Sequence, residues 1–179
     1  MAHHLVAVVG RPNVGKSTFV NRIAGTNDSI VHEMRGVTRD RSYHEADWNG
    51  RKFTLIDTGG IEMGGDDAFQ ASIRDQAFEG AHECDVIIFL VDGRTGINAD
   101  DEEVARLLRR ENTPVLVAVN KMDNPDDESA LYEFYNLGLG DPCPISSLHG
   151  IGTGDLLDAL VDELDKIPLR EDEEEDQIN

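Results

Sequence analysis

The feature that most constrains this chain is a short apolar run that passes directly into a loop bounded by glycines. Residues 5–9 (LVAVV) predict a buried strand, and residues 10–17 (GRPNVGKS) fit the pattern G-x-x-x-x-G-K-S/T. Apolar residues then recur at helical spacing, which predicts a helix over 16–25. A strand, a glycine-bounded loop and a helix in this order predict a site for a nucleoside triphosphate.

The residues of this loop have separate expected roles. Gly10 and Gly15 let successive backbone N–H groups point at phosphate oxygens, at the positive end of the helix dipole. Lys16 adds a mobile positive charge, and Ser17 offers a hydroxyl to the Mg²⁺ that accompanies a triphosphate. The loop residues predicted to bind the nucleotide are Asn13, Val14, Gly15, Lys16, Ser17 and Thr18.

A second motif lies at the end of another strand. Residues 53–56 (FTLI) lean apolar and pass into 57–60 (DTGG), which fits D-x-x-G. Asp57 can hold Mg²⁺ through water, and the N–H of Gly60 can reach a γ-phosphate oxygen.

The polar loop over 26–42 lies between these two motifs and contains Thr38. A threonine here can complete the Mg²⁺ shell when a γ-phosphate is present, although a neighbouring residue could serve instead. The predicted metal ligands are Ser17, Thr38 and Asp57.

A third motif indicates which base is bound. Residues 115–119 (VLVAV) predict a buried strand that delivers Asn120-Lys121-Met122-Asp123, an N-K-x-D pattern. The carboxylate of Asp123 can accept hydrogen bonds from N1–H and from the exocyclic amino group of guanine, a donor pair that adenine lacks. The stem of Lys121 can lie along the base, and the amide of Asn120 can brace the phosphate loop. The three motifs together predict a guanine nucleotide site.

Strands and helices are expected to alternate along the chain. Asn49-Gly50 is a strong hairpin signal, so the strands on either side of it should be antiparallel. The expected fold is α/β, a doubly wound, mainly parallel six-stranded sheet with one antiparallel edge strand. The predicted strands are 5–9, 43–48, 52–56, 85–91, 114–119 and 143–145, and the predicted helices are 16–25, 67–81, 100–111, 128–136 and 153–166.

The amino-acid sequence in and around the motifs resembles that of a known family. Residues 10–17, 36–41 (GVTRDR), 55–61 (LIDTGGI) and 149–157 (HGIGTGDLL) are similar to the first G domain of the Der (EngA) family of bacterial tandem GTPases, which belong to the Era-like GTPases. The likeness extends over about residues 5–168.

This resemblance implies a P-loop NTPase fold and an enzyme that hydrolyses GTP to GDP in assembly of the large ribosomal subunit. It also implies that the base is contacted by a loop made of Ser146, Ser147 and Leu148. The chain departs from the family pattern at two positions: Arg35 replaces the usual proline, and Ser147 replaces the usual alanine.

The residue that would activate water is missing from its usual place. Many GTPases place a glutamine after D-x-x-G, whereas this chain has Ile61, which cannot orient water, so slow intrinsic turnover is expected. The resemblance implies that a potassium ion held near Asn13 supplies the missing charge; alternatively, Asn13 simply forms a turn. The predicted catalytic residues are Asn13, Lys16, Thr38 and Gly60.

The charge of the chain argues against direct RNA binding. Sixteen basic and 36 acidic residues give a net charge of −20, which repels a phosphate backbone. Residues 171–176 (EDEEED) are typical of a solvated tail, so we expect a G domain over 1–168 and an acidic disordered linker or tail over 169–179. In the family such a linker leads to a second G domain and a KH-like domain, which implies that the chain is a truncated piece whose ribosome contacts lie in those domains. A complete single-domain protein is the alternative.

A cytoplasmic protein without a membrane partner is expected. Apolar residues make up 39% of the chain, no apolar run approaches the ~18 residues of a membrane span, and no signal peptide is visible. Two other functions stay open. One is a nucleotide-dependent binding module with negligible hydrolysis, and the other is a related membrane-associated or septation GTPase.

Overall fold

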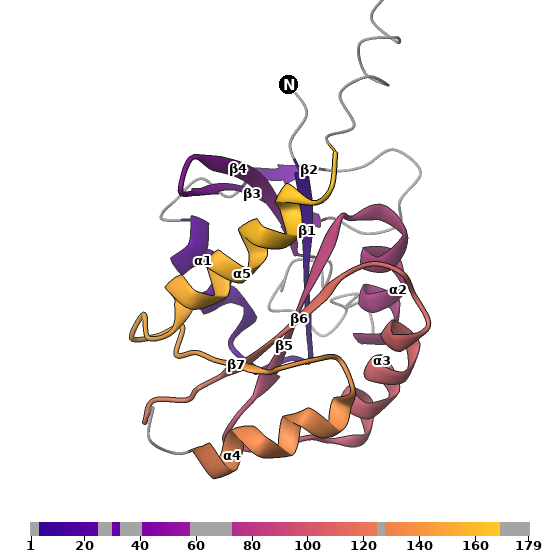
Figure 1. The fold of residues 1–179 in the computed structure, drawn as a ribbon, viewed down its shortest axis with the longest axis vertical. Helices are drawn as coiled ribbons and strands as arrows, with labels where there is room; N and C mark the ends of the chain where they lie inside the picture. Colours follow the sequence, from indigo (N-terminus) through magenta and orange to yellow (C-terminus); the bar gives the residue numbers. More distant parts are fainter. Residues whose placement is uncertain (1–3, 25–29, 33–40, 58–72, 125–127, 169–179) are drawn as a thin grey trace, which may run out of the picture.

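The computed structural model describes residues 4–24, 30–32, 41–57, 73–124 and 128–168. Figure 1 shows a twisted sheet with α1 and α5 on one face and α2 and α3 on the other. The elements are β1 (His4–Gly10), α1 (Lys16–Ala24), β2 (Ile30–His32), β3 (Arg41–Trp48), β4 (Arg51–Asp57), α2 (Ile73–Glu83), β5 (Val86–Asp92), α3 (Ala99–Arg109), β6 (Val115–Asn120), α4 (Glu128–Tyr132), the 3₁₀ helix η1 (Glu133–Leu137), β7 (Cys143–Pro144) and α5 (Thr153–Asp165).

The strands form one seven-stranded sheet in the order β2-β3-β4-β1-β5-β6-β7. The pairs from β4 to β7 are parallel, and β3 is antiparallel to both β4 and β2. The predicted doubly wound α/β fold is therefore confirmed. The sheet contains one strand beyond the six expected, because the three residues of β2 pair with β3 inside the stretch expected to be loop. The antiparallel strand β3 therefore lies inside the sheet, and the prediction that it forms an edge was wrong. A run of three residues is too short to reveal a period of two in the sequence.

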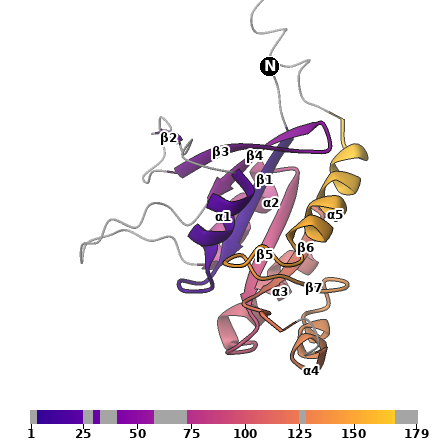
Figure 2. The ribbon, with the colours of Figure 1, turned by 90° about the vertical axis from the view of Figure 1, so that its left-hand side faces the viewer.

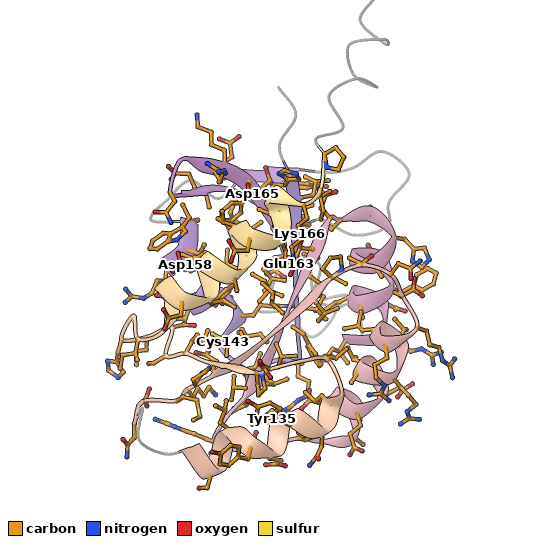
Figure 3. All side chains as sticks on the ribbon, in the orientation of Figure 1. Tyr135, Cys143, Asp158, Glu163, Asp165 and Lys166 are labelled. Atoms are coloured by element: carbon orange, nitrogen blue, oxygen red, sulfur yellow. The ribbon has the colours of Figure 1, made fainter. Side chains whose placement is uncertain are left out.

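The predicted hairpin between β3 and β4 is confirmed. Trp48 pairs with Arg51, and the turn residues Asn49 and Gly50 have φ angles of 51° and 79°, as a two-residue turn with two positive φ angles requires. Trp48 Nε1 donates to Asp158 Oδ1 of α5 at 2.8 Å. Figure 2 shows this hairpin turn beside α5, and Figure 3 labels Asp158 on that helix.

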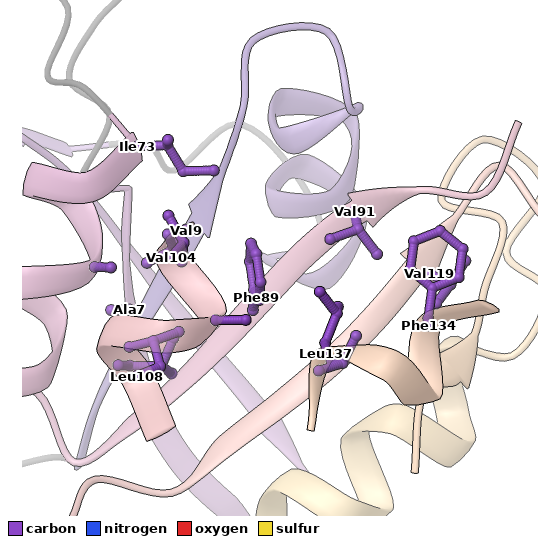
Figure 4. Packing of buried hydrophobic residues seen from close by; sticks show 14 of the residues in the cluster. Ala7, Val9, Ile73, Phe89, Val91, Val104, Leu108, Val119, Phe134 and Leu137 are labelled. Carbon is purple, nitrogen blue, oxygen red and sulfur yellow. The ribbon is translucent and has the colours of Figure 1, made fainter. Parts of the chain in front are cut away.

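Alternate residues of the central strands pack against opposite helical layers. Ala7 and Val9 belong to a buried cluster with residues of α2, α3 and η1, in which Phe89 of β5 lies near the centre (Figure 4). Val6 and Val8 instead belong to a second cluster with residues of α1 and α5. All seven residues of β5 are buried, as expected for a parallel strand covered on both faces.

Two helices differ most from their predicted bounds, and α3 and α5 differ by only one or two residues at an end. The structure describes α2 from Ile73 to Glu83, and the first part of the predicted helix 67–81 lies outside the described residues. The predicted helix 128–136 is five residues of α-helix followed by the 3₁₀ helix η1. Its second half is rich in aromatic residues and asparagine, which have only modest helix propensity.

Candidate functional site

The predicted motifs follow the carboxyl ends of neighbouring parallel strands. β1 leads into the loop before α1, β4 ends at Asp57, β5 ends at Asp92 and β6 ends at Asn120. Because β4, β1, β5 and β6 are consecutive in the sheet, these strand ends share one edge. This is where open α/β sheets bind ligands.

The loop between β1 and α1 has a backbone conformation that restricts its sequence. Asn13 and Gly15 have φ angles of 73° and 95°. A Cβ atom on Gly15 would collide with the side-chain nitrogen of Asn120, so position 15 requires glycine for both space and φ. Val14 is fully buried and anchors the loop against the core.

The lysine at the start of α1 lies between two other elements. Lys16 Nζ is 3.2 Å from Asp57 Oδ1 at the end of β4 and donates to Gln76 Oε1 of α2 at 3.0 Å. The same Gln76 oxygen accepts from the backbone N–H of Gly10 at 3.2 Å. The first glycine and the lysine of the loop are therefore both bonded to one residue of α2.

Asn120 joins the N-K-x-D segment to two other loops. Its Nδ2 donates to the carbonyl of Val14 at 2.8 Å, inside the phosphate loop. Its Oδ1 accepts from the backbone N–H of Ser147 at 2.9 Å and from the Ser147 hydroxyl at 3.0 Å. The serine at position 147 thus adds a hydrogen bond that an alanine could not make.

Lys121 also contacts the phosphate loop. Its Nζ donates to the carbonyl of Asn13 at 2.7 Å and to Asp92 Oδ2 at 2.9 Å. Burial acts to raise the pKa of Asp92, but hydrogen bonds from Lys121 and from the N–H groups of Arg94 and Thr95 outweigh it, so the pKa is lowered. Asp92 therefore stays charged and fixes the lysine.

Asp123 is held by a partner on each oxygen. Its Oδ1 accepts from the Ser146 hydroxyl at 2.8 Å, and its Oδ2 accepts from Arg94 Nη2 at 2.6 Å. The Ser146 hydrogen bond and then the Arg94 guanidinium lower the pKa of this carboxyl. Asp123 is thus ionised at neutral pH, the state that can accept hydrogen bonds from a ligand.

The loop over 146–148 is fixed from the other side by α1. Arg22 Nε donates to the carbonyl of Ser147 at 2.5 Å, and Arg22 Nη2 donates to the carbonyl of Leu148 at 3.0 Å. The side chain of Leu148 is exposed, whereas Ser146 and Ser147 are buried. The loop therefore sits against the end of β6 with its tip in solvent.

The structure brings most of the predicted site residues together. Ser17 and Thr18 are exposed at the start of α1, next to Lys16. Thr38, Gly60 and Ile61 lie outside the described residues. The predicted site residues that the structure describes lie around this edge of the sheet, and they are Asn13, Val14, Gly15, Lys16, Ser17, Thr18, Asp57, Asn120, Lys121, Asp123, Ser146, Ser147 and Leu148.

The oxygen atoms at this edge of the sheet suit a single hard cation that also binds ligands from outside the protein. Among the residues that the structure describes, no group of three or more His, Cys, Asp and Glu side chains could hold a metal ion. Ser17 and the buried Asp57 instead offer oxygen ligands at the phosphate loop, where Asp57 Oδ1 lies 3.2 Å from Lys16 Nζ. Mg²⁺ is commonly bound in this way, through one or two protein oxygens together with phosphate oxygens and water.

Sequence reasoning missed Gln76, Asp92 and Arg94, which all contact predicted site residues. Gln76 had a detectable signal, because it lies on the otherwise apolar buried face of α2, with Ile73, Ala77 and Gly80. A polar residue on a buried face needs a hydrogen-bond partner. Asp92 ends strand β5, which carried no recognised motif, and Arg94 follows that strand.

Comparisons with known proteins identify the family of the chain. The family model described as "50S ribosome-binding GTPase" matches residues 5–121. GTPase Der of Moorella thermoacetica is 55% identical over 172 residues, which are 96% of this chain and 39% of that protein. The chain thus spans well under half the length of this curated relative.

Solved structures extend the likeness to the fold. The Aquifex aeolicus Era protein bound to GDP and aluminium fluoride has a TM-score of 0.70 and 31% identity, covering 91% of this chain and 57% of that one. The G domain of the Thermotoga maritima FeoB iron transporter has a TM-score of 0.69 at 23% identity, covering 90% of this chain and 99% of that one, and shows the fold alone. Within the described part of the chain, no helix has the length and apolar character needed to cross a membrane.

Proposed function

The chain belongs to the family of 50S ribosome-binding GTPases, and from this membership we propose that it is a guanine-nucleotide switch that binds GTP and hydrolyses it to GDP. One observation carries the proposal. Asn120 and Lys121 of the base motif donate to the carbonyls of Val14 and Asn13 in the phosphate loop. The base motif and the phosphate loop are therefore parts of one site, as a single nucleotide requires.

The phosphates would bind at the loop between β1 and α1. Its backbone N–H groups and the N-terminus of α1 attract negative charge, and Lys16 adds a donor that can reach the β- and γ-phosphates. Ser17, Asp57 and Thr38 are the proposed ligands of Mg²⁺, which neutralises charge on the phosphates when it is bound. The backbone N–H of Gly60 would contact the γ-phosphate and respond to its loss.

The base would bind at the edge formed by the loops after β6 and β7. The ionised Asp123 would accept N1–H and the exocyclic amino group of guanine, a donor pair that adenine does not offer. Ser146 fixes one carboxylate oxygen, and Asn120 fixes the backbone of Ser147 nearby. The arrangement supports strong preference for guanine over adenine nucleotides.

Titration calorimetry tests nucleotide binding. We expect the chain to bind GDP and GTP with Mg²⁺, and to bind ADP and ATP at least ~10⁴-fold more weakly. Lys16→Ala and Ser17→Ala should weaken the binding of Mg²⁺-GTP, because a phosphate partner or a metal ligand is lost. Lys52→Ala is the matched control, since Lys52 is an exposed lysine near the far end of β4. Equal affinity of the wild type for GTP and ATP would refute the proposal.

A single-turnover assay tests hydrolysis. A protein that only binds the nucleotide would leave GTP unhydrolysed over hours, whereas the proposed enzyme converts GTP to GDP. Because Ile61 cannot orient water, we propose that a potassium ion near Asn13 provides the charge that a catalytic side chain would otherwise supply.

The cellular output that we propose is assembly of the large ribosomal subunit in the cytoplasm. It is supported by the family description and by the relatives called GTPase Der, of which the chain covers 39%. The net charge of −20 of the 179-residue chain argues that it does not grip RNA directly and that contacts with the subunit are made by other domains, a second G domain and a KH-like domain. Depleting the protein should lower the ratio of large to small subunits in sucrose gradients, and an unchanged ratio would contradict this role.

A further inference from the structure

Gln76 is a buried polar residue that touches the phosphate loop from a different element. The residue is 3% exposed and lies on the inner face of α2. Burying an amide is unfavourable unless it is hydrogen-bonded. Gln76 Oε1 accepts from Lys16 Nζ at 3.0 Å and from the N–H of Gly10 at 3.2 Å. The amide oxygen thus accepts from both the ammonium group of Lys16 and the backbone N–H of Gly10, where the loop starts.

A neutral amide oxygen is suited to orienting the ammonium group of a lysine. An ammonium group has three donors, and here Gln76 and Asp57 both lie within bonding distance of Lys16 Nζ. With a nucleotide bound, the Gln76 oxygen and two phosphate oxygens would satisfy all three donors. A neutral amide can orient the ammonium without neutralising its charge, whereas a carboxylate at this position would compete with the phosphates.

We propose that Gln76 is a positioning residue that holds the ammonium of Lys16 toward the phosphates of the bound nucleotide. The side chain of Lys16 is only 15% exposed, so its environment, and not solvent, decides where the ammonium points. Gln76 fixes it relative to Gly10, because both bonds end on the same oxygen. The inference rests on the proposed function, because it concerns how the site binds guanine nucleotides.

A purely structural role would have different consequences. If Gln76 only satisfied the N–H of Gly10 and filled space, its replacement would affect nucleotide binding equally whether or not position 16 is a lysine. If Gln76 acts through Lys16, its effect must vanish once the ammonium is removed. A double-mutant cycle on nucleotide affinity separates the two roles.

The cycle uses Gln76→Met, which keeps the length of the side chain and removes its amide. We expect Gln76→Met to weaken binding of a fluorescent GDP and of a GTP analogue about tenfold in the wild-type background, as for loss of a hydrogen bond to a charged group. In the Lys16→Ala background the same change should alter affinity less than about twofold. Arg74→Met is the matched control, since Arg74 lies on α2 with an exposed side chain paired to Glu103.

Gln76→Glu provides a second variant that keeps an acceptor for Gly10. We expect it to fold as the wild type does, with the same thermal midpoint, and to bind nucleotides more weakly than Gln76→Met, because the new carboxylate pairs with Lys16. Wild-type affinity in Gln76→Met and Gln76→Glu would overturn the inference, and so would equal weakening in the lysine and alanine backgrounds. Failure of the wild type to bind any guanine nucleotide would instead overturn the proposed function.

Discussion

At the scale of single residues, Gly15 and Gly50 show two different reasons why a position requires glycine: its backbone conformation, and the space around its Cα atom. Both have positive φ, 95° and 79°, but a Cβ on Gly15 would collide with Asn120, whereas a Cβ on Gly50 would meet no atom within 4 Å. The turn position therefore needs only backbone freedom. The loop position needs space as well, because the amide of Asn120 lies against it.

Gly15→Ala should accordingly disrupt the site, while Gly50→Ala should be mild. We expect Gly50→Ala to lower the free energy of unfolding by about 1 kcal/mol, the strain of a left-handed alanine, and to leave GDP affinity unchanged. Gly15→Ala should weaken GDP binding at least ~100-fold, because it displaces Asn120 from the carbonyl of Val14 as well. Urea unfolding and calorimetry give the two quantities, and GDP affinity within twofold of the wild type in Gly15→Ala would contradict the packing argument.

Asp123→Asn should change the preferred base. The amide would present a donor where the carboxylate presented an acceptor, which matches the carbonyl of xanthine and mismatches the amino group of guanine. We expect GDP affinity to fall and XDP affinity to rise until the order of preference reverses, measured by calorimetry with both nucleotides. Asp141→Asn, at an exposed position after η1, should keep the original order. Unchanged GDP affinity in Asp123→Asn would remove this residue from the base site.

Residues with a fixed spacing were predictable, and residues that meet only through the fold were not. Asn120, Lys121 and Asp123 follow one strand, so their placement at the sheet edge follows from the strand alone. Gln76 reaches Lys16 across 60 positions of sequence, and its contact depends on how α2 packs on the sheet. Arg94 reaches Asp123 through a turn whose geometry is set by hydrogen bonds to Asp92.

At the scale of elements, the start of α3 is tied to the phosphate loop. Asn98 and Asp101 form a capping box at the N-terminus of α3, and Arg11 Nε donates to Asp101 Oδ1 at 2.9 Å. Asp101 is fully buried, and burial raises the pKa of its carboxyl despite the guanidinium of Arg11. One carboxylate therefore caps a helix and pairs with a residue of the neighbouring loop.

Asp101→Ala should destabilise the protein strongly. It removes a cap and leaves the guanidinium of Arg11, whose side chain is 16% exposed, without its partner. We expect the free energy of unfolding to fall by about 3 kcal/mol, measured by urea unfolding. Asp100→Ala, at the exposed neighbouring position, should change it by less than about 0.5 kcal/mol. Similar unfolding midpoints for the two variants would show that the contact contributes little.

Elements with a clear hydrophobic period were predicted well, and short elements were not. The apolar runs of β1, β5 and β6 match the predicted strands to within a residue or two, because a strand buried on both faces must be apolar throughout. β2 has three residues and was expected to be loop. Pairing with β3 makes it a strand, and that pairing is a tertiary contact which no local pattern records.

At the scale of the whole molecule, the core clusters of the described part of the chain extend almost to its last described residue. The cluster on the face of α1 and α5 includes Leu164, with Ile167 packed against it. Deleting residues 171–179 should therefore move the melting temperature by no more than about 2 °C, since a run of like charges contributes little buried apolar surface. Calorimetric scanning and GDP binding of the truncated chain test this, and a large fall in the melting temperature would mean that the acidic residues dock on the domain.

The dependence of GTP hydrolysis on the monovalent cation is a property of the whole site. If a potassium ion supplies the charge that Ile61 cannot, single-turnover hydrolysis of GTP should rise about tenfold or more when sodium is replaced by potassium at constant ionic strength. Asn13 has a φ of 73°, so Asn13→Gly removes the side chain without straining the backbone, and the carbonyl that accepts from Lys121 remains.

This variant should lose the response to potassium and keep its GDP affinity, as expected for an interaction made mainly in the transition state. Asn49→Gly, with a φ of 51° in the hairpin turn, is the matched control and should keep the response. Equal rates in the two salts for the wild type would exclude the cation mechanism. Since Ile61 offers no hydrogen-bonding group, the catalytic charge would then have to come from a partner surface, and hydrolysis by the isolated chain would stay slow in either salt.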